Sequence, residues 1–164
     1  MKPDIGSGDL GETDVTGGGR VAKDSPLMEA LGSIDEATSA IGLARALVEN
    51  TERKELLLWC QKALSACGAE IAGDNATGFD FTEGARRAEH EMRRLGETYA
   101  RPTCFVMPGE SVREAALNVA RAVVRRAERN AVALTRAGVR FDMGVIKFLN
   151  RLSDLLFDLA CAWI

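Results

Sequence analysis

The sequence has few aromatic residues, a single histidine and no long hydrophobic run, and each shortage argues against a class of protein. Aromatic residues are only 5% of the chain, too few for the stacking by which proteins bind single-stranded nucleic acid. The single histidine, and the lack of Cys-x-x-Cys spacing among the four cysteines, argue against a zinc site. No long apolar segment follows the N-terminus, so we expect no secretion signal, no membrane span and a cytoplasmic location.

The residues that are abundant favour helices. Hydrophobic residues make up 46% of the 164 residues. Alanine and leucine dominate them, which favours aliphatic helix packing over a β sandwich. The length suits one domain with a sizeable core, and we expect that domain to be all-α. Cys60 and Cys67 lie a heptad apart on one helix face, so we expect them to be buried.

Capping residues and apolar spacing predict five helices. Ser25-Pro26 is a typical helix start, and Ser111 with Glu114 forms a capping box. The mostly short loops between the helices suggest an up-and-down five-helix bundle over residues 25–164, with residues 1–24 as a glycine-rich segment of the same domain. Apolar residues recurring at intervals of three and four place the helices at 26–49, 52–72, 82–99, 111–136 and 142–162.

The helix predicted at 111–136 carries an unusual row of charge. At about 100° per residue, Arg121, Arg125, Glu128 and Arg129 fall on one side and the apolar residues on the other. Like charges four residues apart destabilise an isolated helix by a few tenths of a kcal/mol. Guanidinium groups gathered in this way suit phosphate or carboxylate. A solvated charged face is the alternative interpretation.

Residues 1–24 combine glycine with hydroxyl and charged side chains and have the pattern of neither a helix nor an ordinary strand. Glycine lets backbone N–H groups approach a ligand, and the side chains add donors, so this composition can wrap an oligophosphate. No Gly-Lys-Ser/Thr ends the segment, so it is not a Walker A loop. A flexible, partly disordered tail is the alternative interpretation. The residues concerned include Gly6, Ser7, Gly8, Asp9, Gly11, Thr13, Gly17, Gly18, Gly19, Arg20 and Lys23.

A connector, residues 100–109, precedes the arginine-bearing helix. Its two prolines, Pro102 and Pro108, predict an irregular backbone. The apolar side chains of Phe105 and Met107 need either the core or a ligand to cover them. From the residues alone we favour burial in the core.

Three blocks of the sequence together carry a resemblance. They are Ser7-Gly8-Asp9-x-Gly11-x-Thr13 with Gly19-Arg20-Val21-x-Lys23-Asp24, then Val106-Met107-Pro108-Gly109 leading to Arg121-x-x-x-Arg125-Arg126-Ala127-Glu128-Arg129, and Phe148-Leu149-Asn150-Arg151-Leu152-Ser153-Asp154-x-Leu156-Phe157. The linking stretch Glu29-Ala30-x-Gly32-x-x-Asp35-Glu36 with Ala40-Ile41-Gly42 also matches. In this order and at this separation they resemble the PduO-type ATP:cob(I)alamin adenosyltransferases. The resemblance spans most of the chain.

The resemblance implies a five-helix bundle that forms a homotrimer, with active sites at the subunit interfaces. It implies transfer of the 5′-deoxyadenosyl group of ATP to the cobalt of cob(I)alamin, giving adenosylcobalamin and triphosphate, with Mg²⁺ accompanying the nucleotide. A flavin-type reductase and an adenosylcobalamin-dependent enzyme are implied partners. A non-catalytic or weakly catalytic carrier or sensor of ATP or adenosylcobalamin with the same fold is the alternative function. A helical module that binds acidic protein or RNA is a third, disfavoured by the net charge of −3.

The resemblance also implies roles for individual residues. Arg125 and Arg129 would be catalytic, Asp35 would pair with Arg125 across the subunit interface, and Phe105 and Met107 would face the corrinoid. No metal ligand is implied. The ATP-binding residues would be Ser7, Gly8, Asp9, Thr13, Lys23, Arg125, Arg126, Glu128, Arg129 and Asn150.

The chain departs from the family pattern at three positions. Gly6 stands where a basic residue is common, Asn118 where a histidine is common, and Glu110 where a second glycine is common. Loss of a cation beside the phosphates should weaken ATP binding by about 1 to 2 kcal/mol if it made one charge-assisted hydrogen bond. Lys2, Arg20 or Lys23 are candidates to compensate.

Overall fold

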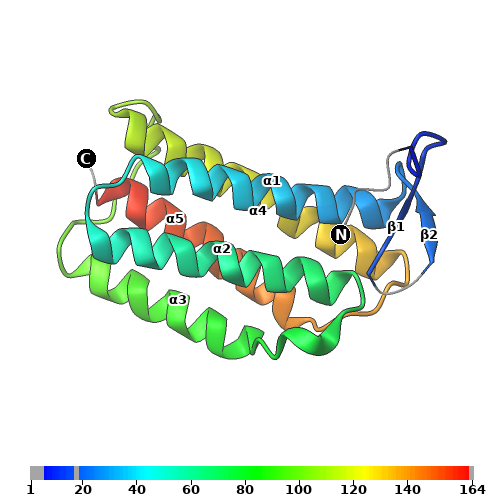
Figure 1. Cartoon of the computed structure of the whole chain (residues 1–164). Coiled ribbons are helices and arrows are strands. Elements are labelled where there is room, and N and C mark those ends of the chain that lie inside the picture. The colour runs from blue at the N-terminus through cyan, green and yellow to red at the C-terminus, as the bar shows by residue number, and fades with distance from the viewer. Residues whose placement is uncertain (1–5, 17–18, 163–164) are drawn as a thin grey trace.

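Five helices form an up-and-down bundle with a small β hairpin at one end (Figure 1), which confirms the predicted fold class. The computed structural model describes residues 6–16 and 19–162, so Lys2, Gly17 and Gly18 lie outside the described residues. No helix within these residues is long and apolar enough to span a bilayer. The helices are α1 (Pro26–Ala46), α2 (Thr51–Ile71), α3 (Phe81–Gly96), α4 (Val112–Arg136) and α5 (Gly144–Cys161), and a short 3₁₀ turn, η1 (Asn75–Thr77), follows α2.

The predicted capping residues begin two of these helices. Ser25 Oγ accepts a hydrogen bond from the Met28 N–H at 3.4 Å, and Ser111 Oγ accepts one from the Glu114 N–H at 3.1 Å. Each bond satisfies a backbone donor that has no partner inside the helix. The starts of α1 and α4 are therefore fixed by local sequence.

Two helices end earlier than their apolar spacing predicts. α1 stops at Ala46 because Asn50 caps α2 in an extended backbone conformation, which leaves residues 47–50 for the turn. α3 stops at Gly96, where Thr98 turns both its backbone N–H and its hydroxyl onto the Leu95 carbonyl. A threonine bonded in this way offers the backbone an alternative to the helix.

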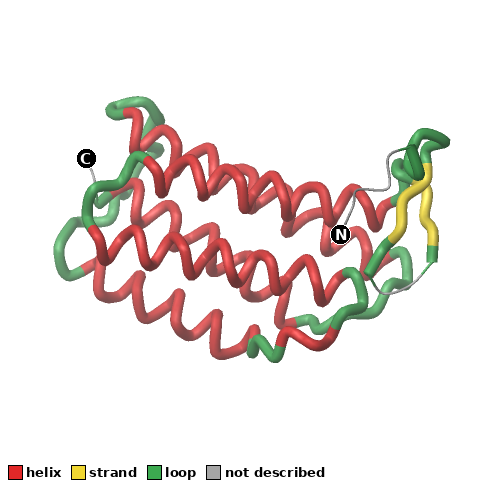
Figure 2. Tube along the Cα trace, in the orientation of Figure 1, coloured by secondary structure: helices red, strands yellow, loops and turns green. Residues whose placement is uncertain are grey.

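The bundle is arranged so that α4 lies between α1 and α5. α1 also packs on α2, and α5 also packs on α3 (Figures 1 and 2). The core consists mainly of aliphatic side chains, with Phe148 as its largest fully buried member. Because the apolar stripe of α4 is covered on both sides, its arginine face is turned outward.

The N-terminal segment contains two short strands, so the expectation of no strand there is wrong. β1 (Glu12–Asp14) pairs antiparallel with β2 (Arg20–Ala22). The guanidinium of Arg20 joins the two strands through ion pairs with Glu12 at 3.3 Å and Asp14 at 3.7 Å. Its Nη2 also donates to the Ser7 carbonyl at 2.6 Å. Such cross-strand contacts stabilise a short ladder that alternation of residue types does not reveal.

Cys60 and Cys67 are fully buried, as the heptad spacing predicts. Burial raises the pKa of the Cys60 thiol to about 12 and raises the pKa of Cys67 as well. Cys161 is buried too, and its pKa is raised chiefly by desolvation. Cys104, in the connector, is exposed. The thiolate is the reactive form of cysteine, so the four thiols should differ sharply in reactivity.

We expect a thiol reagent at pH 8 to label Cys104 rapidly in the native protein and the other three cysteines only after unfolding. Absorbance of the released chromophore measures this, and Cys104→Ser should remove the fast phase. The raised pKa values of the three buried thiols also affect the free energy of unfolding. Their contribution is fully present below the unfolded thiol pKa of about 8.5 and is lost progressively as the pH rises above it. Rapid labelling of Cys104→Ser would contradict the burial of the three core thiols.

Candidate functional site

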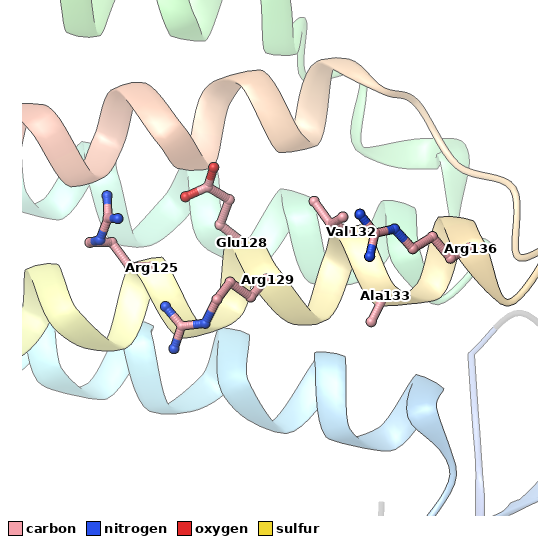
Figure 3. A pocket seen from close by; sticks show the side chains of 6 residues that line it. All are labelled: Arg125, Glu128, Arg129, Val132, Ala133 and Arg136. Carbon is pink, nitrogen blue, oxygen red and sulfur yellow. The ribbon is translucent and has the colours of Figure 1, made fainter.

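The exposed face of α4 forms a hollow of about 550 Å³ (Figure 3). Helical periodicity brings the lining residues together, since they recur at intervals of three and four. Val132, Ala133 and Arg136 were not singled out from the sequence, although Arg136 follows Arg129 by two turns and extends the same row. The lining residues are Arg125, Glu128, Arg129, Val132, Ala133 and Arg136.

All of these residues come from one helix, so the hollow has a single wall. The side chains of Arg125 and Arg129 are exposed, while Glu128 is half-buried toward α5. Three guanidinium groups against one carboxylate leave an excess of positive charge in the hollow. This composition suits a ligand with several anionic oxygens.

Asn150 of α5 supports the hollow from behind. Its Nδ2 donates to Glu128 Oε1 at 3.2 Å, and its Oδ1 accepts from Arg151 Nη1 at 2.7 Å. Arg151 Nε in turn donates to Glu89 of α3 at 2.7 Å, and this hydrogen bond lowers the pKa of the Glu89 carboxyl. The predicted site residue Asn150 therefore reaches the hollow through its hydrogen bond to Glu128, and it fixes the direction of that carboxylate.

Two predicted site residues lie elsewhere on α1 and α4. Arg126 does not line the hollow, and its guanidinium pairs with Glu36 of α1. Asp35 is exposed on α1, and no ion pair joins it to another residue in the part of the chain that the structure describes. Adjacent residues on a helix are about 100° apart, which is why Glu36 faces α4 and Asp35 does not.

The hairpin gathers the predicted phosphate-binding residues of the N-terminal segment. A Cβ atom built on Gly8 would lie 2.8 Å from Lys23 Nζ, so the lysine ammonium packs directly against the glycine backbone. The Lys23 N–H donates to the Gly11 carbonyl at 2.8 Å. Gly6 has a φ of 96°, a conformation that a basic residue adopts only with strain. A basic side chain at position 6 would therefore be strained in this backbone conformation.

Within one chain the hairpin and the hollow are separate. A second hollow, between the hairpin and the ends of α1 and α2, is lined in part by Asp14, Thr16, Leu31 and Ala72. No hairpin residue in the described part of the chain lines the α4 hollow. Of the candidates to replace the missing cation, Arg20 is engaged in bracing the strands. Lys23 is the one that sits on the glycine turn.

The connector corrects one prediction from the residues. Phe105 is 83% exposed and Met107 is 71% exposed, so burial of both in the core is wrong. The connector runs across the end of the bundle away from the hairpin (Figure 1). The buried core side chains come almost entirely from the helices, and none comes from residues 100–109. Both side chains are therefore accessible to a ligand or to another protein surface.

Among the described residues, no group of three or more His, Cys, Asp or Glu side chains could hold a metal ion. Mg²⁺ is commonly bound through substrate phosphates with few protein ligands. The side chains present are therefore compatible with a magnesium ion carried by a nucleotide and held largely by its phosphate oxygens.

Comparison with known proteins identifies the family. A family model described as cobalamin adenosyltransferase matches residues 5–163. A corrinoid adenosyltransferase from Mycobacterium leprae is 39% identical over 168 residues, covering 94% of this chain and 86% of the relative. One from Citrobacter freundii is 34% identical over 161 residues, covering 94% of this chain and 90% of the relative.

Solved structures agree with the family match. A variant PduO-type ATP:corrinoid adenosyltransferase from Lactobacillus reuteri, complexed with cobalamin and ATP, superposes with a TM-score of 0.90 at 28% identity. The superposition covers 99% of this chain and 93% of that one. Since the sequence match extends over nearly the whole length, this chain belongs to the cobalamin adenosyltransferase family.

Proposed function

We propose that the protein transfers the 5′-deoxyadenosyl group of ATP to the cobalt of cob(I)alamin, giving adenosylcobalamin and triphosphate. The observation that carries this is the family match over residues 5–163. The row of guanidinium groups in the α4 hollow provides what the reaction needs, because a triphosphate leaving group gathers negative charge as it departs.

The reaction requires alignment and charge neutralisation from the protein. A cobalt–carbon bond forms at the ribose C5′ as the carbon–oxygen bond to the triphosphate breaks, and the bonding electron pair leaves with the triphosphate. The cobalt(I) centre of the substrate is itself the nucleophile, so no side chain has to remove a proton. Arg125 and Arg129 neutralise the leaving group, and Glu128, held by Asn150, orients the nucleotide.

The rest of the ATP site belongs to the N-terminal segment in this proposal. Ser7, Gly8, Asp9 and Thr13 wrap the triphosphate, with Lys23 as the point charge beside it. Arg126 contributes only when released from Glu36. Mg²⁺ accompanies the nucleotide on its phosphate oxygens.

A homotrimer would complete the site. The α4 hollow has one wall, and the hairpin of the same chain does not line it. A neighbouring subunit can supply both a second wall and its own hairpin. Asp35, exposed on α1, would then pair with Arg125 of a neighbouring copy. That carboxylate, together with the triphosphate, would offset the repulsion along the arginine row.

Phe105 and Met107 form the corrinoid face in this proposal, because they are exposed apolar side chains on a connector next to α4. A reductase of the flavin type would supply cob(I)alamin, and an adenosylcobalamin-dependent enzyme would take the product. These two partners are inferred from the chemistry of substrate and product.

Anaerobic incubation of the protein with ATP and chemically reduced cobalamin tests the function. We expect the corrinoid absorbance to change as the cobalt–carbon bond forms, with triphosphate released in equal amount. Binding of both ligands without either product would instead indicate a carrier or sensor with the same fold.

A further inference from the structure

Two buried carboxylates hold the connector, one near each end. Near its C-terminal end, Glu114 of α4 is 1% exposed, and its Oε2 accepts a hydrogen bond from the Gly109 N–H at 2.7 Å. The other oxygen, Oε1, accepts from Asn118 Nδ2. Near the N-terminal end, Asp158 of α5 is 4% exposed, and its Oδ1 lies 3.0 Å from Arg101 Nε in an ion pair.

The bond from Glu114 to Gly109 goes beyond helix capping. In a capping box the glutamate reaches back to the N–H of the N-cap residue, which here is Ser111. Glu114 instead binds an N–H two residues earlier, at a glycine whose φ is 130°. Residues with a side chain rarely adopt this conformation. Glu114 therefore fixes a turn in the connector as well as the start of α4.

The two ends of the connector are linked through one aromatic ring. Arg121 Nε donates to Asn118 Oδ1 at 3.1 Å, which extends the Glu114 network along α4. The guanidinium carbon of Arg121 lies 6.0 Å from the centre of the Phe157 ring, and that of Arg101 lies 5.6 Å from it. Arg121 thus connects the Glu114 network to the Phe157 ring, and Arg101 connects Asp158 to the same ring. Both guanidinium groups are attracted to the ring by cation–π interactions.

Tyr99 also lies beside Asp158, at the N-terminal end of the connector. Burial of the Tyr99 hydroxyl raises its pKa, and its hydrogen bond to the Asp158 carboxylate raises the pKa further. No hydrogen bond reaches Asp158 Oδ1 from any described residue, so the attraction to Arg101 is coulombic. Leaving a buried charge without its ion-pair partner is strongly unfavourable, and this favours keeping Arg101 beside Asp158 at the start of the connector.

We infer that Glu114 and Asp158 are positioning residues, which clamp the connector so that Phe105 and Met107 are presented to the corrinoid as a preformed face. This inference rests on the proposed function. Neither carboxylate lies in the α4 hollow, where the nucleotide is proposed to bind. A connector ordered in advance avoids the entropy loss of ordering it during binding. Loosening the clamp should therefore weaken corrinoid binding and leave ATP binding unchanged.

Glu114→Gln tests the clamp, because it keeps the size of the side chain and removes its charge. We expect the KM for cob(I)alamin to rise roughly tenfold, the scale of converting a charge-assisted hydrogen bond into a neutral one. The KM for ATP should change by less than about twofold, the size expected of a substitution that does not touch the bound ligand, because Glu114 does not line the α4 hollow. Glu83→Gln, an exposed residue on α3 paired with Arg86, is the matched control and should change neither constant.

A double-mutant cycle separates positioning from a general loss of stability. If Glu114 acts through the presented face, Phe105→Ala should abolish most of the effect of Glu114→Gln on the corrinoid KM. Additive effects of the two substitutions, an equal rise in both KM values, or no rise in either would overturn the inference. Should Glu114→Gln fail to fold by circular dichroism, Asp158→Asn is measured in its place with the same expected outcomes.

The activity assay on the unmodified protein distinguishes failure of this inference from failure of the proposed function. Absence of adenosyl transfer by the unmodified chain would remove the function and with it the inference. Normal transfer by the unmodified chain, combined with unchanged KM values in Glu114→Gln, would remove the inference alone.

Discussion

Replacing Arg125 with alanine should reduce adenosyl transfer by about 10²- to 10³-fold, the loss typical when a group that stabilises transition-state charge is removed. Arg129→Ala should have an effect of the same size. Both side chains lie exposed in the α4 hollow, and no described core residue depends on them for packing. The rate is measured with ATP and reduced cobalamin under anaerobic conditions. The far-UV circular dichroism of both variants should match that of the unmodified protein.

The matched control for these variants is Arg86→Ala on α3. Arg86 is also an exposed helical arginine, and it pairs with Glu83 at 2.9 Å. The change in net charge is the same, so a similar loss of activity in the control would point to overall charge and not to the hollow. Light scattering on all three variants shows whether the assembly state has changed. Normal turnover in both Arg125→Ala and Arg129→Ala would mean that the site is misplaced.

Replacing Phe148 with alanine should give the largest loss of stability. The ring is fully buried and packs edge-on against Trp59, with ring centres 5.9 Å apart, and against Phe79 at 5.8 Å. Phenylalanine to alanine in a core lowers the free energy of unfolding by about 3 to 5 kcal/mol. For a domain of this length the midpoint of thermal unfolding should fall by roughly 6 to 20 °C. Differential scanning calorimetry measures the shift.

Leu58→Ala is the comparison for this second prediction. Leu58 is a large apolar residue of α2 that is partly exposed, so its truncation leaves less of a cavity and should lower stability by less than about 1 kcal/mol. Equal losses in the two variants would indicate that Phe148 does not occupy the packed centre of the bundle.

The helices were predictable because their signals are local. Ser25 and Ser111 cap α1 and α4 through bonds that span three residues, and the apolar stripes depend only on the helical period. The hairpin was missed because its stability depends on Arg20 reaching across to Glu12 and Asp14. No property of the isolated residues shows that these side chains are opposite one another.

The candidate site was predictable in part for the same reason. Arg125, Glu128 and Arg129 meet because one helix spaces them, and the sequence pattern contains that information. Arg126 was grouped with them by resemblance, yet it turns to Glu36 because α1 packs on that side of α4. The exposure of Phe105 was not predictable from its apolar character, because it depends on where the connector crosses the end of the bundle.

The sequence alone therefore determined the helical fold, the family and the row of guanidinium groups, since each depends on residue identity and on spacing within one segment. Tertiary structure decided which guanidinium groups line the hollow, as Arg125 and Arg129 do, and which pair with another helix, as Arg126 does with Glu36. It placed Asn150 behind Glu128, and it set buried Glu114 and Asp158 at the two ends of the connector. The pairs Asn150–Glu128 and Arg101–Asp158 join different elements, so only the packing of the bundle brings them within bonding distance, whereas the bond from Gly109 to Glu114 reaches around the turn before α4.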